Sequence, residues 1–151
     1  MASHSRSLHT SAAPEVVWRI WSDPPGWATW NPDVSSVTLE GPFGVGAGGT
    51  MTTKSGGSHQ IQFTTVEDGR AFELETRVVP LTQFVFRCEV WPESDGGSQI
   101  SQTLTMRGPL AVIFSPMMGG RIAEAFDPIL RGLAARASRW EANAGNGRRW
   151  S

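Results

Sequence analysis

Few residues in this chain could serve catalysis or specific binding inside the protein. His59 is the one histidine outside the N-terminal segment, Cys88 is the single cysteine, and Gln102 lies within an otherwise apolar alternating stretch. A histidine facing a cavity can act as an acid/base group or as a polar anchor. A buried glutamine costs of order 1–3 kcal/mol if its amide has no partner, so a ligand or water would have to satisfy it.

Each of these residues also has a purely structural interpretation. His59 stands near the start of a strand-like stretch, where it can be half exposed and structural. Gln102 would be solvated if the expected register were wrong, so both interpretations stay open for these two residues. Cys88 is more typical of a small core residue than of a nucleophile, because no inward histidine is expected beside it.

The residue inventory argues against several other kinds of site. Three histidines and one cysteine give no cluster with metal-ligand spacing, so we expect no metal and no cofactor. The segment Gly44–Gly49 matches G-x-G-x-x-G, but strand-like residues follow it where a dinucleotide site needs a helix. We interpret it as a flexible loop at a cavity mouth. A net charge of -1 gives no electrostatic footprint for nucleic acid.

The length of 151 residues is typical of a single domain, spanning 1–151, with an ordered core at about 6–142 and a flexible tail at 143–151. No run of about 18 apolar residues is present, so we expect no membrane insertion. The N-terminus has no charged segment followed by an apolar one, which predicts a cytoplasmic protein.

The stretch from Met117 to Glu141 predicts one long helix. Its large apolar residues recur every three or four positions, at Met118, Ile122, Phe126, Ile129, Leu133, Ala137 and Trp140. This spacing places them on one helical stripe. Pro128 interrupts the pattern: either the helix kinks there, or Asp127 caps a second segment. The stripe runs through the proline unbroken, which favours a kink.

The chain before this helix predicts strands and two short helices. A first strand is expected at Arg6–Thr10, followed by a helix at Pro14–Trp21 capped by Ser11 and a second short helix from Trp27 that ends before Pro32. From Val34 the apolar residues alternate with polar ones, which is typical of half-buried strands. The next strand is expected to begin at Val34. The strands expected after it are Thr50–Lys54, Ser58–Val66, Arg70–Val79, Gln83–Trp91 and Ser98–Arg107.

Three turns then predict the register of an antiparallel meander. They are an Asp68-Gly69 hairpin, a three-residue turn at Pro80–Thr82, and a five-residue loop centred on Asp95. The pairs they predict are Phe63–Leu74, Thr65–Phe72, Leu74–Cys88, Thr76–Phe86, Cys88–Gln102 and Phe86–Leu104. Glu75 would then lie opposite Arg87 on the outer face. A further turn is expected at Gly56-Gly57.

In this order of elements the chain resembles the START-like (SRPBCC, Bet v 1-like) superfamily, and within it the polyketide cyclase/dehydrase-like group. The matching residues are Ala13–Trp18, Ser22–Pro24, Trp27, Trp30–Pro32, Leu39–Pro42, Gly96–Ser98, Gly108–Leu110 and the final helix. The resemblance covers roughly Leu8 to Glu141. It implies an α+β helix-grip fold, in which a curved antiparallel sheet of about seven strands wraps around a long C-terminal helix, with two short helices after the first strand.

The resemblance implies binding of a small hydrophobic molecule, lipid-, polyketide- or aromatic-like, between the sheet and the C-terminal helix. The residues expected to line this site are Trp27, Trp30, His59, Phe63, Leu74, Thr76, Phe86, Cys88, Gln102, Leu104, Phe126 and Leu130.

Two other functions stay open. One is a polyketide cyclase/dehydrase-type enzyme with His59 as acid/base, although inward polar residues are few. The other is a protein-interaction module with a filled core and a large exposed apolar patch. The tryptophans between Trp18 and Trp30 either seal one end of the sheet or line a pocket entrance. A homodimer is also open.

Overall fold

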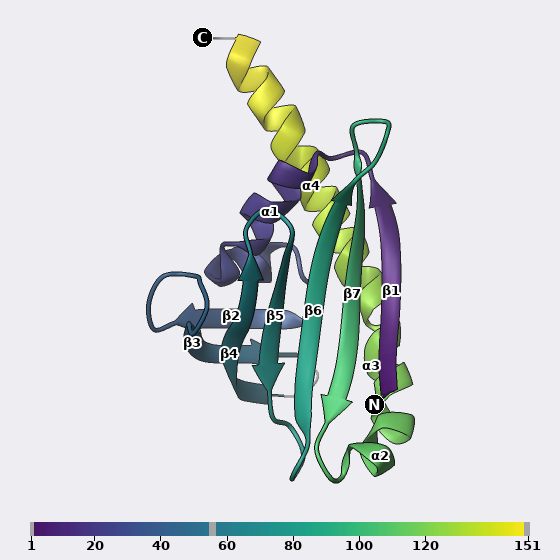
Figure 1. The fold of residues 1–151 in the computed structure, drawn as a ribbon. Coiled ribbons are helices and arrows are strands. Elements are labelled where there is room, and N and C mark those ends of the chain that lie inside the picture. Colours follow the sequence, from purple (N-terminus) through teal and green to yellow (C-terminus); the bar gives the residue numbers. More distant parts are fainter. Residues whose placement is uncertain (1, 55–56, 150–151) are drawn as a thin grey trace.

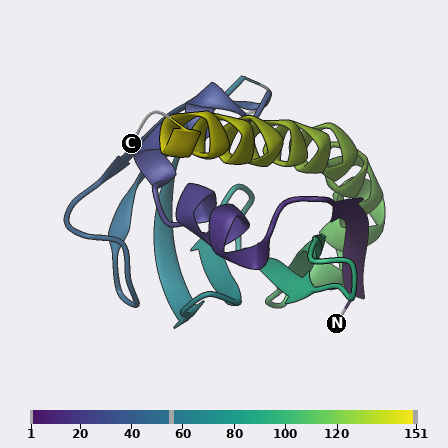
Figure 2. The ribbon, with the colours of Figure 1, turned by 90° about the horizontal axis from the view of Figure 1, so that it is seen from above.

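The computed structural model of this protein describes residues 2–54 and 57–149. In this part of the chain, seven antiparallel strands form one sheet in the order β1-β7-β6-β5-β4-β3-β2. A long C-terminal helix lies across its concave face, and two short helices close one end (Figures 1 and 2). This is the α+β, helix-grip arrangement that the sequence predicts.

The N-terminal elements follow the expected order with some shifted boundaries. β1 (Ala2–Thr10) is longer than expected because it pairs with β7 along its whole length. α1 (Pro14–Trp21) matches its prediction, but Ser11 does not cap it. Glu141 of the C-terminal helix instead accepts a 3.0 Å hydrogen bond from the Ala13 amide. The second short helix, η1 (Pro24–Thr29), is a 3-10 helix that begins earlier than expected, at a proline pair.

The remaining strands build the curved sheet. Their bounds are β2 (Val34–Leu39), β3 (Gly48–Thr53), β4 (Gly57–Glu67), β5 (Ala71–Thr76), β6 (Gln83–Pro92) and β7 (Ser98–Arg107). β2 and β3 run across the direction of the other strands, so that the sheet curls around the helix (Figure 1). Gly56, half of one expected turn, lies outside the described residues.

The predicted register is correct for two of the three hairpins at the inner face, with one local change. Cys88 pairs with Gln102, and Phe63 pairs with Leu74, as expected. Beyond Phe63 the register of β4 against β5 shifts, so that Thr65 lies opposite Glu73 and not Phe72. Such an irregularity adds a residue on one strand, which two-residue turn chemistry alone does not predict.

The register of β5 against β6 differs from the prediction by two residues. Leu74 pairs with Phe86, and Thr76 with Phe84. The cause is the connection, which is a six-residue loop (77–82) and not a three-residue turn. Leu81 has a positive φ of 52° there, and the Thr82 hydroxyl donates to the Pro80 carbonyl at 3.0 Å. A shift of two leaves the inner face unchanged, because side chains alternate with a period of two.

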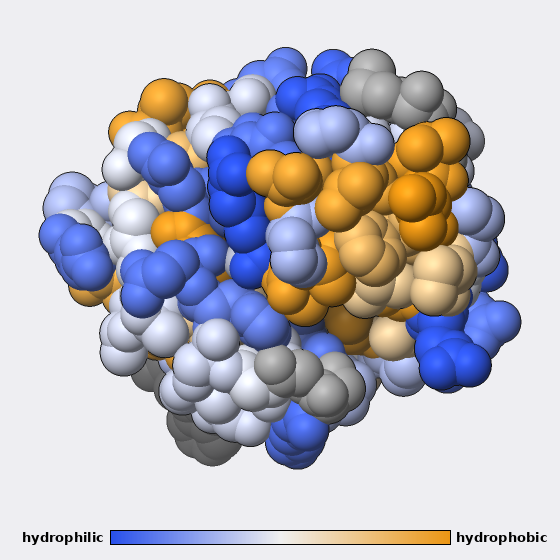
Figure 3. All heavy atoms as spheres, turned by 90° about the horizontal axis from the view of Figure 1, so that it is seen from below, coloured by the Kyte–Doolittle hydropathy of each residue, from blue (hydrophilic) through white to orange (hydrophobic). Residues whose placement is uncertain are grey.

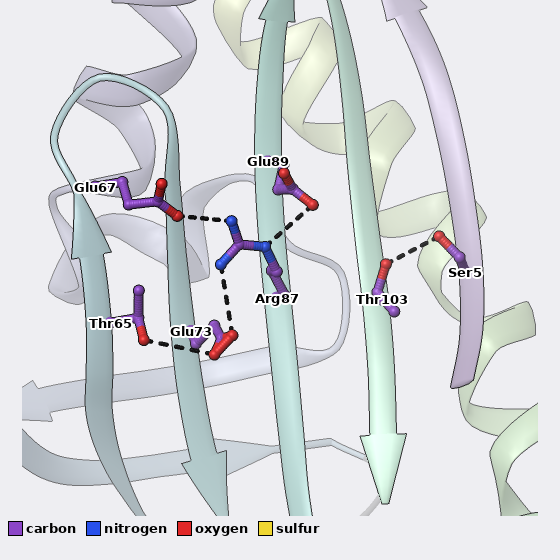
Figure 4. Close-up of polar contacts among 7 residues, drawn as sticks. All are labelled: Ser5, Thr65, Glu67, Glu73, Arg87, Glu89 and Thr103. Atoms are coloured by element: carbon purple, nitrogen blue, oxygen red, sulfur yellow. Dashed lines mark hydrogen bonds and ion pairs between the residues drawn. The ribbon is translucent and has the colours of Figure 1, made fainter. Parts of the chain in front are cut away.

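The outer face is changed by this shift. Arg87 lies opposite Glu73, not Glu75, and its guanidinium also reaches Glu67 at 2.6 Å and Glu89 at 3.1 Å (Figure 4). Partial burial lowers the pKa of Arg87, but its hydrogen bonds with Glu67 and Glu89 outweigh this and raise the pKa above the ordinary arginine value. The group ties β4, β5 and β6 together on the outside, away from the cavity.

The C-terminal helix is interrupted three residues before Pro128. Its segments are α2 (Ala111–Phe114), a π-helical turn η2 (Ser115–Gly119), α3 (Gly120–Glu124) and α4 (Phe126–Arg149). A proline ring clashes with the carbonyl four residues earlier, here that of Glu124, so the break falls in the preceding turn. The expected kink at Pro128 is therefore a break at Ala125, and Figure 2 shows the bend. α4 extends past residue 143, where the flexible tail was expected to begin.

Two hydrophobic clusters make up the core. The larger one joins the tryptophans of α1 and η1 to Phe63, Phe72 and the part of α4 around Leu133. The smaller one joins Phe84, Leu104 and Met106 to α2, α3 and the start of α4. Trp30 packs against both clusters. The interior is thus divided, which leaves space where the two clusters meet.

Candidate functional site

A cavity of about 350 Å³ lies between the sheet and the broken helix. This volume is within the range of ~300–1,000 Å³ that small-molecule sites occupy. Its walls come from both hydrophobic clusters. The lining residues are Trp21, Trp27, Trp30, Asn31, Asp33, Val34, Met51, Thr53, His59, Phe72, Leu74, Thr76, Val78, Phe84, Phe86, Cys88, Gln102, Met118, Ile122, Ala125, Phe126 and Ile129.

Most of the residues predicted for the site lie in this wall. The structure brings together Trp27, Trp30, His59, Leu74, Thr76, Phe86, Cys88, Gln102 and Phe126. Phe63, Leu104 and Leu130 do not line the cavity; each is almost completely buried behind it. They were expected to line the site, but inward-facing positions of a strand or helix include both wall and core, which periodicity alone does not distinguish.

An aromatic wall closes one side of the cavity. Trp27 stacks on Phe72 with ring centroids 5.7 Å apart, and Trp21 meets Phe72 edge-on at 5.6 Å. The indole nitrogen of Trp27 donates to the backbone carbonyl of Trp21 at 3.1 Å, which fixes the Trp27 ring. The tryptophans of the short helices therefore both seal the sheet and line the pocket.

The glycine-rich loop does not take part in the wall. Phe43, at its start, packs edge-on against Phe63 at 5.0 Å, behind the aromatic wall. None of the described residues from Gly41 to Ala47 lines the cavity. β3 follows the loop where a dinucleotide site needs a helix. The expected loop at the cavity mouth is therefore wrong.

The middle of the sheet wall carries Cys88 and Gln102 side by side. The Gln102 amide forms no hydrogen bond with any described residue, although it faces a mostly apolar space. Burial, together with the nearby charge of Glu89, raises the pKa of the Cys88 thiol well above its usual value. The Cys88 thiol therefore stays protonated at neutral pH, and Gln102 has no hydrogen-bond partner among the described residues.

Trp30 adds a second unpartnered polar group. Its indole nitrogen is buried and has no hydrogen-bond partner among the described residues. Trp30 lines the cavity where η1 ends, and its ring meets Trp27 edge-on at 6.4 Å. Buried polar groups in proteins nearly always have partners, so a group without one indicates a place for a ligand or water.

One end of the cavity is polar. His59 pairs with Met51 across β3 and β4, while Thr53 pairs with Val34, and this brings His59 and Thr53 near Asn31 and Asp33. Asn31 is held by an Asx turn, in which its side-chain oxygen accepts from the Asp33 amide at 3.0 Å. His59 lines the cavity together with Val78 and Phe84, whereas Met106 lies behind the wall.

Asp33 is the functional candidate that sequence reasoning missed. It precedes β2, in a connection to which no inward face could be assigned. The run Asn31-Pro32-Asp33 carries an Asx-turn signal, which would have predicted a defined conformation there. On the helix side, Met118, Ile122 and Ile129 were predicted on the apolar stripe, but a stripe does not show which of its members face a cavity.

His59 and Thr76 also line a second, more open groove on the other side of the sheet. The last residue pair between β4 and β5 is Ile61 with Thr76, so the first residues of β4 have no β5 partner. The sheet is therefore incomplete at this corner. The Thr76 hydroxyl donates to the Gln60 carbonyl at 2.8 Å and holds the edge of the gap.

The described residues contain no group of three or more His, Cys, Asp or Glu side chains that could hold a metal ion. Among their helices, none is both long enough and apolar enough to cross a membrane.

Comparison with known proteins agrees with this architecture. A family profile described as polyketide cyclase / dehydrase and lipid transport matches residues 1–138. The chain belongs to this family. No curated protein matches the chain in sequence.

Solved structures show that the family fold is widely shared. The Zhui aromatase/cyclase from Streptomyces sp. R1128 has a TM-score of 0.74 at 13% identity, covering 91% of this chain and 94% of its own. A START superfamily protein from Mycobacterium smegmatis has a TM-score of 0.72 at 14% identity, covering 91% and 98%. Ara h 8.0201 has a TM-score of 0.73 at 12% identity, with the same coverage. Identities this low establish the fold and leave the ligand and any reaction to be argued from the cavity.

Proposed function

We propose that this member of the polyketide cyclase / dehydrase and lipid transport family binds a small, mainly apolar molecule in the cavity between the sheet and the helix. The observation that carries the proposal is the Gln102 amide, which faces the apolar cavity without a hydrogen-bond partner. A ligand that supplies one hydrogen bond there gains orientation, and one that also reaches the buried Trp30 indole nitrogen removes a penalty of about 1–3 kcal/mol.

The cavity also suggests the chemistry of the ligand. Most of the wall is aromatic or aliphatic, so burial of apolar surface would supply the affinity. Gln102 in the middle, and Asn31 and His59 at one end, favour a molecule with a hydroxyl or carbonyl group at about its centre and another at one tip. The interaction module with a filled core is not supported, because the core is not filled.

The first test is native mass spectrometry of protein purified from a cell lysate, followed by titration with 1-anilinonaphthalene-8-sulfonate, a fluorophore with an apolar ring system and one sulfonate. Cys88→Phe places a ring in the cavity, while Thr103→Phe adds the same ring on the opposite face of the sheet. We expect Cys88→Phe to lower the fluorophore affinity by roughly tenfold or more, about 1.4 kcal/mol, and Thr103→Phe to leave it unchanged. Equal affinity in both variants would place the binding elsewhere and sink the proposal.

Gln102→Leu tests the polar anchor separately. Leucine has nearly the volume of glutamine and needs no partner, so the empty protein should become more stable by about 1 kcal/mol. The co-purified ligand should bind more weakly to this variant. Gln99→Leu, on the outer face of the same strand, is the control and should change neither quantity.

A second function is supported by one further observation, namely that two titratable side chains, Asp33 and His59, line the same end of the cavity. A carboxylate and an imidazole together can supply the proton transfers that a cyclisation or dehydration needs. His59→Ala distinguishes the two functions. It should abolish turnover of a polyketide-like substrate if the protein is an enzyme, and only weaken or retune binding if it is a carrier.

A further inference from the structure

Exposed apolar side chains gather at one end of the molecule. Among the residues that the structure describes, five of the six large apolar ones that are strongly exposed come from two segments, the β5–β6 loop and the chain that forms α2 and η2. These five, which we call the apolar end, are Val78, Leu81, Val112, Ile113 and Met117. Figure 3 shows hydrophobic residues gathered on the underside of the molecule, beside a recess.

The two segments are neighbours in space. A Cβ atom at Gly108, in the turn that leads into α2, would collide with the carbonyl oxygen of Leu81. On the inner side, Val79 and Phe114 pack in the same hydrophobic cluster. Both segments lie at the lower end of the molecule (Figure 1), so their outward side chains belong to one surface.

The local backbone holds these side chains outward. Leu81 has a positive φ, which is uncommon for leucine and fixes its direction within the loop. In α2, Ala111 is buried and Phe114 half-buried, whereas Val112 and Ile113 are 78% and 53% exposed. The short helix α2 thus has apolar residues on both sides, and no other part of the described chain covers Val112 and Ile113 on its outer side. Exposed apolar surface of this kind marks an interaction site.

The charge around the apolar end is positive. Arg77, Arg107 and Arg121 flank it, each exposed, and none forms an ion pair with a described residue. No aspartate or glutamate occurs in residues 76–88 or 96–123, the two stretches that include the apolar end. Apolar side chains surrounded by unpaired cations match a surface that has an apolar interior and anionic groups at its boundary.

The apolar end adjoins the cavity. Val78 belongs to both, because it is strongly exposed and also lines the cavity. Met118 and Ile122 line the cavity directly after the exposed Met117. A molecule that leaves a bilayer at this end would thus pass along apolar surface to the cavity.

We propose that the apolar end docks on a membrane surface that contains anionic lipid. The docking is peripheral, with the exposed side chains at the boundary between headgroups and acyl chains, and no helix spans the bilayer. The sequence led us to expect no insertion at all, so shallow docking departs from that expectation. A second copy of this chain fits this surface less well, because a two-fold contact would bring the arginines of both copies together. The proposal goes beyond ligand binding and does not require an occupied cavity.

Co-sedimentation with vesicles tests the proposal on the ligand-free full chain. The probes are vesicles of phosphatidylcholine with about 30% phosphatidylglycerol, and vesicles of phosphatidylcholine alone, at ~0.1 M salt. We expect binding to the anionic vesicles that weakens at least about tenfold when the anionic lipid is left out or the salt is raised to ~0.5 M. Equal binding to both kinds of vesicle, or none to either, overturns the proposal.

Variants locate the docking surface. The combination Leu81→Asn, Val112→Gln and Met117→Gln removes apolar contact, and asparagine tolerates the positive φ of Leu81. It should lower vesicle binding at least about tenfold. Val45→Asn is the matched control, because Val45 is 70% exposed but lies on the glycine-rich loop, and it should bind as the unchanged protein does. Combined replacement of Arg77, Arg107 and Arg121 by glutamine should remove the preference for anionic lipid.

Two further measurements separate the alternatives. Fluorophore binding without vesicles should be unchanged in the Leu81, Val112 and Met117 variant, which shows that it is folded and that the cavity is intact. If this variant loses vesicle binding but keeps fluorophore binding, the loss can be attributed to the apolar end and not to misfolding or a changed cavity. Retained vesicle binding in this variant overturns the proposal. A concentration-dependent dimer that the same variant abolishes also overturns it and favours a second copy.

Discussion

Among single residues, Cys88 gives the clearest dependence on pH. Burial and the charge of Glu89 raise the pKa of its thiol in the folded protein above the value of about 8.5 expected in the unfolded chain. Above that pH the unfolded chain loses a proton that the folded protein retains. The stability supplied by the neutral thiol is therefore complete below about pH 8.5 and is lost as the pH rises.

We expect the free energy of unfolding to fall by up to about 1.4 kcal/mol per pH unit above pH 9, as measured by urea unfolding. Few other groups interfere, because the chain has no tyrosine and Lys54 is its only lysine. Cys88→Ala, which cannot ionise, should flatten this slope. The same slope in both proteins would mean that another group is responsible.

The position of a cavity residue could be predicted from the sequence where it lies on a strand, because alternation along the strand decides which face its side chain is on. Gln102 and Cys88 face each other as expected because strand alternation and one loop length decide both positions. Asp33 was not predictable in the same way, because it lies in a connection whose direction depends on the Asx turn of Asn31 and on the pairing of Val34 with Thr53. Only the folded sheet brings Asp33 beside the strand that carries His59.

Among the elements, α4 approaches η1 through a glycine. A Cβ atom at Gly132 would collide with the carbonyl oxygen of Trp30 and would also touch Pro32. This close contact places α4 against the segment that supplies Trp30 and Asn31 to the cavity. Helix propensity alone favours alanine over glycine by about 1 kcal/mol, so the contact and the propensity predict opposite effects.

We expect the contact to dominate, with Gly132→Ala lowering the free energy of unfolding by about 1–3 kcal/mol. Fluorophore affinity should change as well, because the cavity wall at Trp30 must move. Gly120→Ala is the control within α3, since a Cβ atom there meets nothing within 4 Å. It should stabilise the protein by about 0.5–1 kcal/mol. Stabilisation by Gly132→Ala would show that α4 can move away freely.

The elements also show what local patterns predict and what they do not. β7 and α1 have their predicted bounds because a clear periodicity meets clear turn residues at both ends. The register of β5 against β6 was wrong because a six-residue loop replaced the expected turn at Pro80. The residues of the inner face were still predicted correctly, because a shift of two preserves the alternation of side chains. The predicted partner of Arg87 on the outer face was wrong.

For the whole molecule, the division of the core into two clusters matters most. The larger cluster contains the stacked aromatic residues and the middle of α4, whereas the smaller one depends on the short segments α2, η2 and α3. The cavity lies between them, with lining residues from both. Helical periodicity predicted the apolar stripe correctly, but it could not predict that the break at Ala125 would divide the core.

This division predicts that the smaller cluster opens first. Short helical segments with exposed apolar residues and a π-helical turn have few contacts to hold them, so their amides should exchange through local opening. By hydrogen exchange with mass spectrometry, we expect residues 111–125 to exchange at least about tenfold faster than residues 129–137 of α4.

The fluorophore, which fills the cavity, should slow exchange in residues 115–125, because Met118, Ile122 and Ala125 line the cavity. Cys88→Phe, in which the fluorophore binds weakly, should show no such slowing. If both segments exchange at one rate, the two clusters open together, and a ligand would have to enter the cavity by some other path, such as the gap beside His59.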